Sequence, residues 1–367
     1  MSFDILPNVI LKYICSFLDL ESLAKFSLTN KKHIELYPLI SKIFGSIKAI
    51  FPKEQPYYKP IEYYSARKRH GDAFTLLHHQ CEKFRPSFEV IKYLIESKSN
   101  LNQKNTQGNT PLLCAIKNSR VTFDIVKLLI EKGSNLNCSD DNYQTPLHCA
   151  CKHHRISLET IQYLIDQKCL VNRRDINKFS PLHYACENNF SSIEIIKFLV
   201  ENNAEVKHET NHKTLPIHFI CEKSNKDSVE IIKFLIEKNS SINCKNNNFT
   251  PLHYACQNDK ISLQVINTLI ENKASLNIGD NIFEIPLHHA CRNENVTTEI
   301  IQLLFEKNSD VNHKNVENVS PLQLSMKNIS LEKKLKQKYG VNMTIAKILK
   351  QISKNSNRNN EKKCYMF

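Results

Sequence analysis

The chain has 367 residues, a formal net charge of +13, thirteen cysteines and only six glycines. So few glycines leave no glycine-rich loop that could hold a phosphate. No carboxylate pair or Ser/His/Asp set recurs at a spacing suited to catalysis, and no stretch has the ~20 apolar residues of a membrane-spanning helix. The composition therefore argues against an enzyme, a cofactor site and a transmembrane protein.

The first 45 residues carry an apolar stripe. Pro7 suits a helix start, Ile10 and Ile14 lie on one helical face, and Asp19 suits the cap of a second helix. The order of apolar residues resembles the F-box, a helical module that docks on the Skp-type adaptor of a cullin–RING ubiquitin ligase. The resemblance implies an adaptor-binding face of Leu6, Pro7, Ile10, Leu11, Ile14, Leu18, Leu20 and Leu23. A helical cap packed on the first repeat is the alternative interpretation. Residues 46–70 are expected to form a linker.

Prolines recur every 35 residues further along the chain, at positions 111, 146, 181, 216, 251, 286 and 321. A fixed period of this length indicates stacked supersecondary units. In one unit, Ser180 and Pro181 predict the start of a short helix with Leu182, Ala185 and Cys186 on its buried side. A second apolar helix is expected from Ser192, followed by a polar loop.

This unit resembles the ankyrin repeat, whose Thr-Pro-Leu-His-x-Ala signature appears as Thr145-Pro-Leu-His and Thr250-Pro-Leu-His. The resemblance covers residues 71–328 and implies an all-α solenoid, with capping helices at 329–353. The usual period is 33, so two extra residues are expected in the turn between the helices. One unit departs further: an inserted residue near 225–227 is offset by a deletion in the following loop.

In ankyrin-like units a groove is lined by the loops, called fingers, and by the end of each first helix. This resemblance implies a cargo-binding set of Asn142, Tyr143, Lys152, His153, Lys178, Phe179, Glu187, Asn188, Glu222, Lys223, Phe249, Gln257, Asn258, Ile282, Phe283, Arg292 and Asn293. Phe179 and Phe249 have an equal alternative, which is packing between neighbouring fingers. The partner would be a protein, the cargo.

A His-x-x-Cys pair recurs in the repeats, as in His148 and Cys151, and looks like half of a zinc site. Translation along a stack keeps these pairs apart, so no metal site is expected. The ankyrin resemblance instead implies a histidine bonded near its own finger and a buried thiol. The N-terminus shows no signal peptide, which favours a reducing cytosol.

Charge is distributed unevenly along the chain. Residues 1–70 carry +5, residues 71–326 carry −1 and residues 327–367 carry +9. A nucleic-acid reader should carry its positive charge on the repeat surface, so no nucleic-acid partner is expected.

The tail 354–367 ends in Cys364-Tyr-Met-Phe, which resembles a CaaX prenylation box. The terminal Phe implies geranylgeranylation, and Lys362 and Lys363 supply a basic second signal. A chance free cysteine in a solvated tail is the alternative. Prenylation would place the protein on the cytoplasmic face of a membrane.

Two functions follow. In one, the chain is the substrate receptor of an SCF-type ubiquitin ligase. In the other, it is a plain ankyrin scaffold or inhibitor that sequesters a partner. The combination of F-box, repeats and CaaX box looks like effectors of intracellular bacteria acting in a host cell. Protists and large DNA viruses are the competing sources.

Overall fold

The structure of the protein is a computed structural model. It describes residues 75–96, 98–153, 157–188, 192–223, 225–260 and 262–327. The expected F-box-like module, linker, C-terminal capping helices and tail lie outside these residues. The chain divides into two compact units, Met1–Ser134 and Asn135–Phe367. Neither unit shows, in its described part, a helix long and apolar enough to cross a membrane.

The described part of the first unit consists of two helix pairs. They are α5 (Leu76–Glu82) with α6 (Phe88–Glu96) and α7 (Pro111–Lys117) with α8 (Phe123–Glu131). The first pair follows the same pattern 35 residues earlier, because Thr75 caps α5 where Thr110 caps α7.

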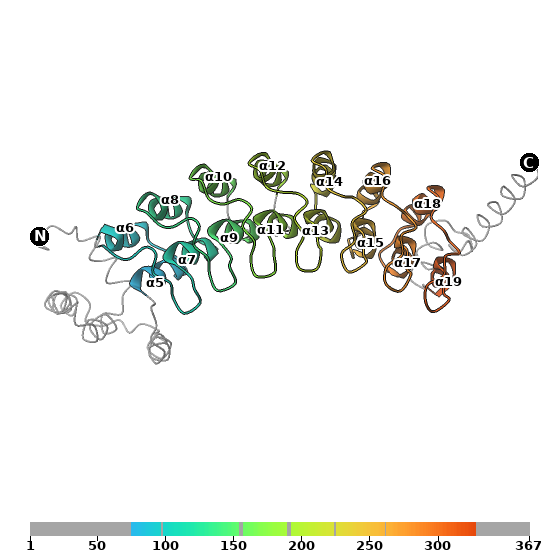
Figure 1. The fold of residues 1–367 in the computed structure, drawn as a ribbon, viewed down its shortest axis with the longest axis horizontal. Helices are drawn as coiled ribbons and strands as arrows, with labels where there is room; N and C mark the ends of the chain where they lie inside the picture. The colour runs from blue at the N-terminus through green and yellow to red at the C-terminus, as the bar shows by residue number, and fades with distance from the viewer. Residues whose placement is uncertain are drawn as a thin grey trace, which may run out of the picture. The chain divides into compact units, whose positions relative to one another are not determined.

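The second unit continues the same pattern as two rows of helices (Figure 1). The inner row is α9 (Pro146–Lys152), α11 (Pro181–Glu187), α13 (Pro216–Lys223), α15 (Pro251–Gln257), α17 (Pro286–Arg292) and α19 (Pro321–Lys327). The outer row is α10 (Leu158–Asp166), α12 (Ile193–Glu201), α14 (Ser228–Glu237), α16 (Leu263–Glu271) and α18 (Thr298–Glu306). The fingers extend from the inner row, on the side away from the outer row.

A reciprocal cap begins the inner helices. In α9, the Thr145 amide donates to His148 Nδ1 at 3.1 Å, and the Thr145 hydroxyl lies 2.7 Å from the same nitrogen. Pro146 occupies the first helical position, where a missing N–H costs no hydrogen bond. Where Leu215 or Ile285 replaces the hydroxyl residue, the backbone amide still donates to the histidine ring.

The outer helices each bury one face and end at a left-handed residue. In α12, Ile193, Ile196 and Leu199 are buried, while the charged residues between them face solvent. Residues with positive φ follow the outer helices, among them Lys168 (65°) and Asn203 (69°). The core therefore lies between the two rows, as the helical spacing of apolar residues predicts.

The divergent repeat absorbs its insertion and deletion separately. Helix α14 has ten residues and α13 has eight, one more than the other helices of their rows. The finger after α14 is a tight turn closed by a bridge between Asn246 and Phe249. Both central residues have positive φ, Asn247 at 44° and Asn248 at 71°, as a primed two-residue turn requires. The predicted offset is confirmed.

Candidate functional site

Each full-length finger of the second unit is closed by the side chain of its first residue. In the finger 140–144, Asp140 Oδ1 accepts hydrogen bonds from the amides of Asn142 and Gln144, both at 2.9 Å. Asp175, Asp280 and Asn315 do the same in their fingers. This closure places the fourth residue of the finger at the tip in the left-handed region.

Two tips carry aromatic residues in that conformation. Tyr143 has φ of 60° and Phe283 has φ of 61°, and their exposed fractions are 56% and 61%. A left-handed residue with a Cβ costs roughly 1–2 kcal/mol, and burial of these rings does not offset that cost. Within the described residues neither ring stacks on another ring. Both side chains are therefore available to a partner.

Unlike the two tip residues, Phe179 and Phe249 are the last residues of their fingers, and their rings are packed against other side chains. The ring of Phe179 packs against Tyr184 at 5.2 Å and Phe219 at 5.4 Å between centroids. The ring of Phe249 packs against His289 at 5.1 Å. Both rings hold one finger against the next inner helix, which is the packing role weighed for them from the sequence.

Backbone hydrogen bonds join several finger tips. The Ile176 amide donates to the carbonyl of Asn142 at 3.0 Å, and the Val316 amide donates to the carbonyl of Ile282 at 3.0 Å. A third bond runs from the Asn211 amide to the carbonyl of Asn177 at 3.1 Å. Ile282 is exposed beside Phe283, and Lys178 is an exposed tip residue. The tips thus form joined rows of exposed side chains.

The ends of the inner helices supply the other predicted groove residues. Lys152, Glu222, Gln257 and Arg292 are exposed, whereas Glu187, His153 and Lys223 are half-buried. The Lys152 ammonium lies 5.0 Å from the centroid of the Tyr184 ring.

Three asparagines of the predicted groove are engaged within the stack. The side-chain amides of Asn188, Asn258 and Asn293 donate to the carbonyls of Cys151, Cys221 and Cys256 at 3.1, 3.2 and 3.1 Å. Each bond joins an inner helix to the preceding one. These amides therefore have a structural role that the sequence pattern did not reveal.

A buried charged cluster at the finger 280–284 was also missed from the sequence. Glu284 is 0% exposed and forms a two-pronged ion pair with Arg292. It also accepts a hydrogen bond from the Asn315 amide at 2.7 Å. Burial raises the pKa of Glu284, but the hydrogen bonds from Arg292 and Asn315 outweigh it, so the net direction is downward. The only sequence signal is a Glu where other fingers carry neutral residues.

The same cluster brings together three groups of metal-ligand type. Ligand atoms of Asp280, Glu284 and His289 lie within 4.8 Å of one another, with the His289 Nε2 3.2 Å from Asp280 Oδ2. The Arg292 guanidinium already contacts both oxygens of Glu284 and supplies the positive charge that a metal ion would bring. We therefore interpret the cluster as an ion-pair network that fixes the finger to α17.

In the repeated His-x-x-Cys pairs of the described repeats, both ring nitrogens of each histidine are engaged in hydrogen bonds. His148 Nδ1 accepts the cap amide, so Nε2 carries the proton and donates to the carbonyl of Phe179 at 3.0 Å, in the finger of the same repeat. Burial lowers the pKa of His183, His218 and His253 to about 4. Burial raises the pKa of the Cys291 thiol to about 12.

The eight residues of the expected adaptor-binding face and Cys364 lie outside the described residues. Their roles in adaptor binding and lipidation stay predictions.

Comparison with known proteins agrees with the repeat geometry. The family described as "Ankyrin repeats (3 copies)" matches residues 61–140, 121–210 and 192–280, and "Ankyrin repeat" matches residues 286–313. A crystal structure of the human ASB11 ankyrin repeat domain is 26% identical, with a TM-score of 0.52. That match covers 61% of this chain and 96% of the human domain. No curated protein sequence matches the chain. The described residues form an all-helical ankyrin-repeat solenoid, a fold that implies a scaffold for protein–protein interaction. The chain belongs to the ankyrin-repeat family.

Proposed function

We propose that the chain is the substrate-receptor subunit of an SCF-type ubiquitin ligase, which recruits a cargo protein through its finger surface. The observation that carries the cargo-binding half is the pair of exposed, left-handed aromatic tips, Tyr143 and Phe283. Exposed aromatic side chains give large contact area at a low cost in conformational entropy. The adaptor-binding half is supported by the F-box-like order of residues 6–23.

In this function the chain performs no chemistry itself. It holds the cargo near a ubiquitin-loaded enzyme and so raises the effective concentration of the two reactants. In this function, loss of adaptor binding should leave cargo binding intact, and loss of cargo binding should leave adaptor binding intact.

The adaptor test is a pull-down of the full chain with a purified Skp-type adaptor. The double variant Leu6→Ala with Pro7→Ala should lose binding, because truncation of an apolar anchor costs ~2 kcal/mol or more. Its repeats should keep the far-UV circular dichroism of the wild type. Equal adaptor affinity of wild type and variant, or no binding by wild type, would reject the ligase assignment.

The cargo test exchanges the two tip aromatics for asparagine. Asn318 occupies the same tip position at φ of 60°, so Tyr143→Asn with Phe283→Asn keeps the backbone conformation. Retained cargo, quantified by mass spectrometry, should fall while the melting temperature holds or rises. Tyr93→Asn is the matched control, because Tyr93 is an exposed aromatic on helix α6 and not in a finger. Loss of cargo with the control variant as well would reject the tips as the binding site.

A plain scaffold or inhibitor is the second candidate function. The described surface favours it to the same degree, because the exposed tips require no ligase to bind a partner. The two functions differ in one measurement: a scaffold retains cargo with or without the adaptor, and its cargo is not ubiquitinated in a reconstituted reaction.

We further propose that Cys364 is geranylgeranylated and holds the protein on the cytoplasmic face of membranes. The support is the terminal Cys-Tyr-Met-Phe sequence with Lys362 and Lys363 directly before it. A fluorescent fusion at the N-terminus should be on membranes, and Cys364→Ser should release it. Because one lipid chain binds only marginally, Lys362→Gln with Lys363→Gln should weaken attachment. An unchanged distribution of Cys364→Ser would exclude the lipid.

A further inference from the structure

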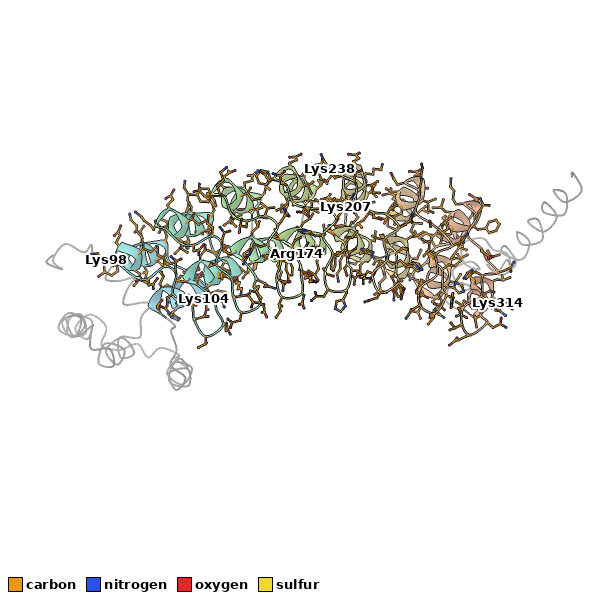
Figure 2. All side chains as sticks on the ribbon, in the orientation of Figure 1. Lys98, Lys104, Arg174, Lys207, Lys238 and Lys314 are labelled. Carbon is orange, nitrogen blue, oxygen red and sulfur yellow. The ribbon has the colours of Figure 1, made fainter. Side chains whose placement is uncertain are left out.

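One finger carries more positive charge than the others. Residues 168–178, here called the basic finger, contain Lys168, Arg173, Arg174 and Lys178 against a single acid, Asp175. The corresponding stretches before and after it, 133–143 and 203–213, carry net charges of −2 and 0. All four bases are exposed, and Figure 2 labels Arg174 beside the inner row of helices of the second unit.

The acid in the basic finger does not neutralise these bases. Asp175 is buried, its Oδ1 accepts the amides of Asn177 and Phe179 at 2.9 Å, and its Oδ2 accepts the Tyr184 hydroxyl at 2.6 Å. Among the described residues, no carboxylate lies within 4.0 Å of any of the four bases. Arg174 is close enough to His208 to lower the pKa of that ring, although burial of the ring has the larger effect.

Apolar side chains lie among these charges. Leu170 is 50% exposed and Ile176 is 55% exposed, and Ile176 stands between Asp175 and Asn177 in the sequence. An exposed aliphatic side chain between unpaired cations favours a ligand that has carboxylates and apolar groups close together.

The basic finger is also held rigidly from both sides. On one side the Leu170 amide donates to Asn137 Oδ1 at 2.9 Å and the Ile176 amide donates to the carbonyl of Asn142 at 3.0 Å. On the other side Asn172 donates to the carbonyl of Asn203 at 2.7 Å, and the Asn211 amide donates to the carbonyl of Asn177. A preorganised surface loses little conformational entropy on binding.

From this arrangement we infer that the basic finger binds an acidic segment of the cargo protein, one with aliphatic or aromatic residues next to its carboxylates. The inference rests on the proposed function and names the chemistry of the partner. A nucleic acid fits less well, because residues 135–326 carry nineteen basic and twenty-three acidic groups and would repel a long polyanion. The basic finger also offers no aromatic platform on which bases could stack, since the Phe179 ring is packed against Tyr184 and Phe219.

The test selects ligands without assuming a sequence. A library of random sixteen-residue peptides is displayed on phage and selected against the immobilised full chain. The enriched peptides should be net acidic and contain apolar residues, and a synthetic peptide of the consensus should bind in fluorescence anisotropy. Its affinity should fall as the salt concentration rises from 0.05 to 0.5 M, because exposed charge pairs are screened.

Two double variants that change the net charge by the same amount test whether the basic finger is the binding site. Arg173→Glu with Lys178→Asn should weaken the consensus peptide at least tenfold, and asparagine suits the left-handed position of Lys178. Lys197→Glu with Lys233→Asn alters two exposed bases of the outer helices and should leave the affinity unchanged.

Other outcomes overturn the inference. They are enrichment of neutral or basic peptides, no enrichment, equal loss in both variants, and tighter binding of a single-stranded RNA oligonucleotide than of the consensus peptide. Adaptor binding is measured on the same proteins. Retained adaptor binding with a failed peptide selection rejects only the basic finger, whereas lost adaptor binding with intact peptide binding rejects only the ligase.

Discussion

Buried histidines should make the repeats sensitive to acid. Burial lowers the pKa of His183, His218 and His253 from 6.5 to about 4. Between these two values the unfolded chain binds more protons than the folded chain, so stability is present above pH 6.5 and is lost as the pH falls toward 4. At pH 5.0 each ring costs roughly 2 kcal/mol relative to pH 7.5, at ~1.4 kcal/mol per pH unit. Three rings together approach the ~5–15 kcal/mol net stability of a typical protein.

The variant His253→Gln separates this effect from other titrations. Gln323 holds the equivalent position in α19, where its Oε1 accepts the Ser320 amide at 2.8 Å, so glutamine can keep the cap. The variant loses the hydrogen bond from His253 to the carbonyl of Glu284, which costs about 1 kcal/mol. At pH 7.5 it should be less stable than the wild type. At pH 5.0 it avoids the ~2 kcal/mol titration cost and should be more stable.

Urea unfolding followed by far-UV circular dichroism measures both differences, since the chain has no tryptophan for fluorescence. His212→Gln is the matched control, because His212 is an exposed finger residue. The reasoning fails if the sign of the difference between His253→Gln and wild type is the same at both pH values. It also fails if wild-type stability does not change between pH 7.5 and 5.0.

Three further outcomes are expected. Arg292→Ala should destabilise the protein by ~1–3 kcal/mol, because the buried Glu284 carboxylate loses its two hydrogen bonds from the guanidinium and keeps only Asn315 and His289 beside it. Thermal unfolding measures this, and a loss below ~1 kcal/mol would contradict the ion-pair network. Lys207→Asn should stabilise the protein by ~1 kcal/mol. Lys207 is at the position that Asn172 holds one repeat earlier, where the Asn172 side chain donates to a carbonyl of the next repeat, and the new asparagine should form the same kind of bond. An unchanged urea midpoint would show that this bond does not form. Asn258→Ala should cost ~1 kcal/mol by removing the bond to the preceding inner helix, and unchanged stability would refute that role.

The regular part of the fold could be predicted because its information is local. Ser180-Pro181 begins α11 and Ser192 stands at the N-cap position of α12, which are the positions that serine and proline prefer at helix starts. The insertion near Asn225 and the shortened finger at 246–249 could also be predicted, because the proline period constrains both ends of that repeat.

The sequence could not predict which individual side chains bond or pack within the stack and which are exposed to solvent. Asn188 and Lys152 look equally suited to a groove, yet only the first donates to a carbonyl of the preceding helix. Tyr143 and Phe179 stand in similar fingers but at different positions: Tyr143 is the left-handed tip, whereas Phe179 follows the tip Lys178 and packs against Phe219 of an inner helix. Such differences depend on contacts between residues about 30–40 positions apart, which a single repeat does not contain.

The buried cysteines have a consequence for how unfolding of this protein proceeds and can be followed. Cys151, Cys186, Cys221, Cys256 and Cys291 occupy the same position in successive inner helices and are at most 2% exposed. Burial raises the pKa of each thiol, so these sulfurs are poor nucleophiles while their repeat is folded. Opening of a repeat exposes its thiol to alkylation. Peptide mass spectrometry of the alkylated cysteines then measures the rate at which each repeat opens. In an oxidising solution the same exposure permits cross-links between opened repeats, so refolding is expected to be reversible only under reducing conditions.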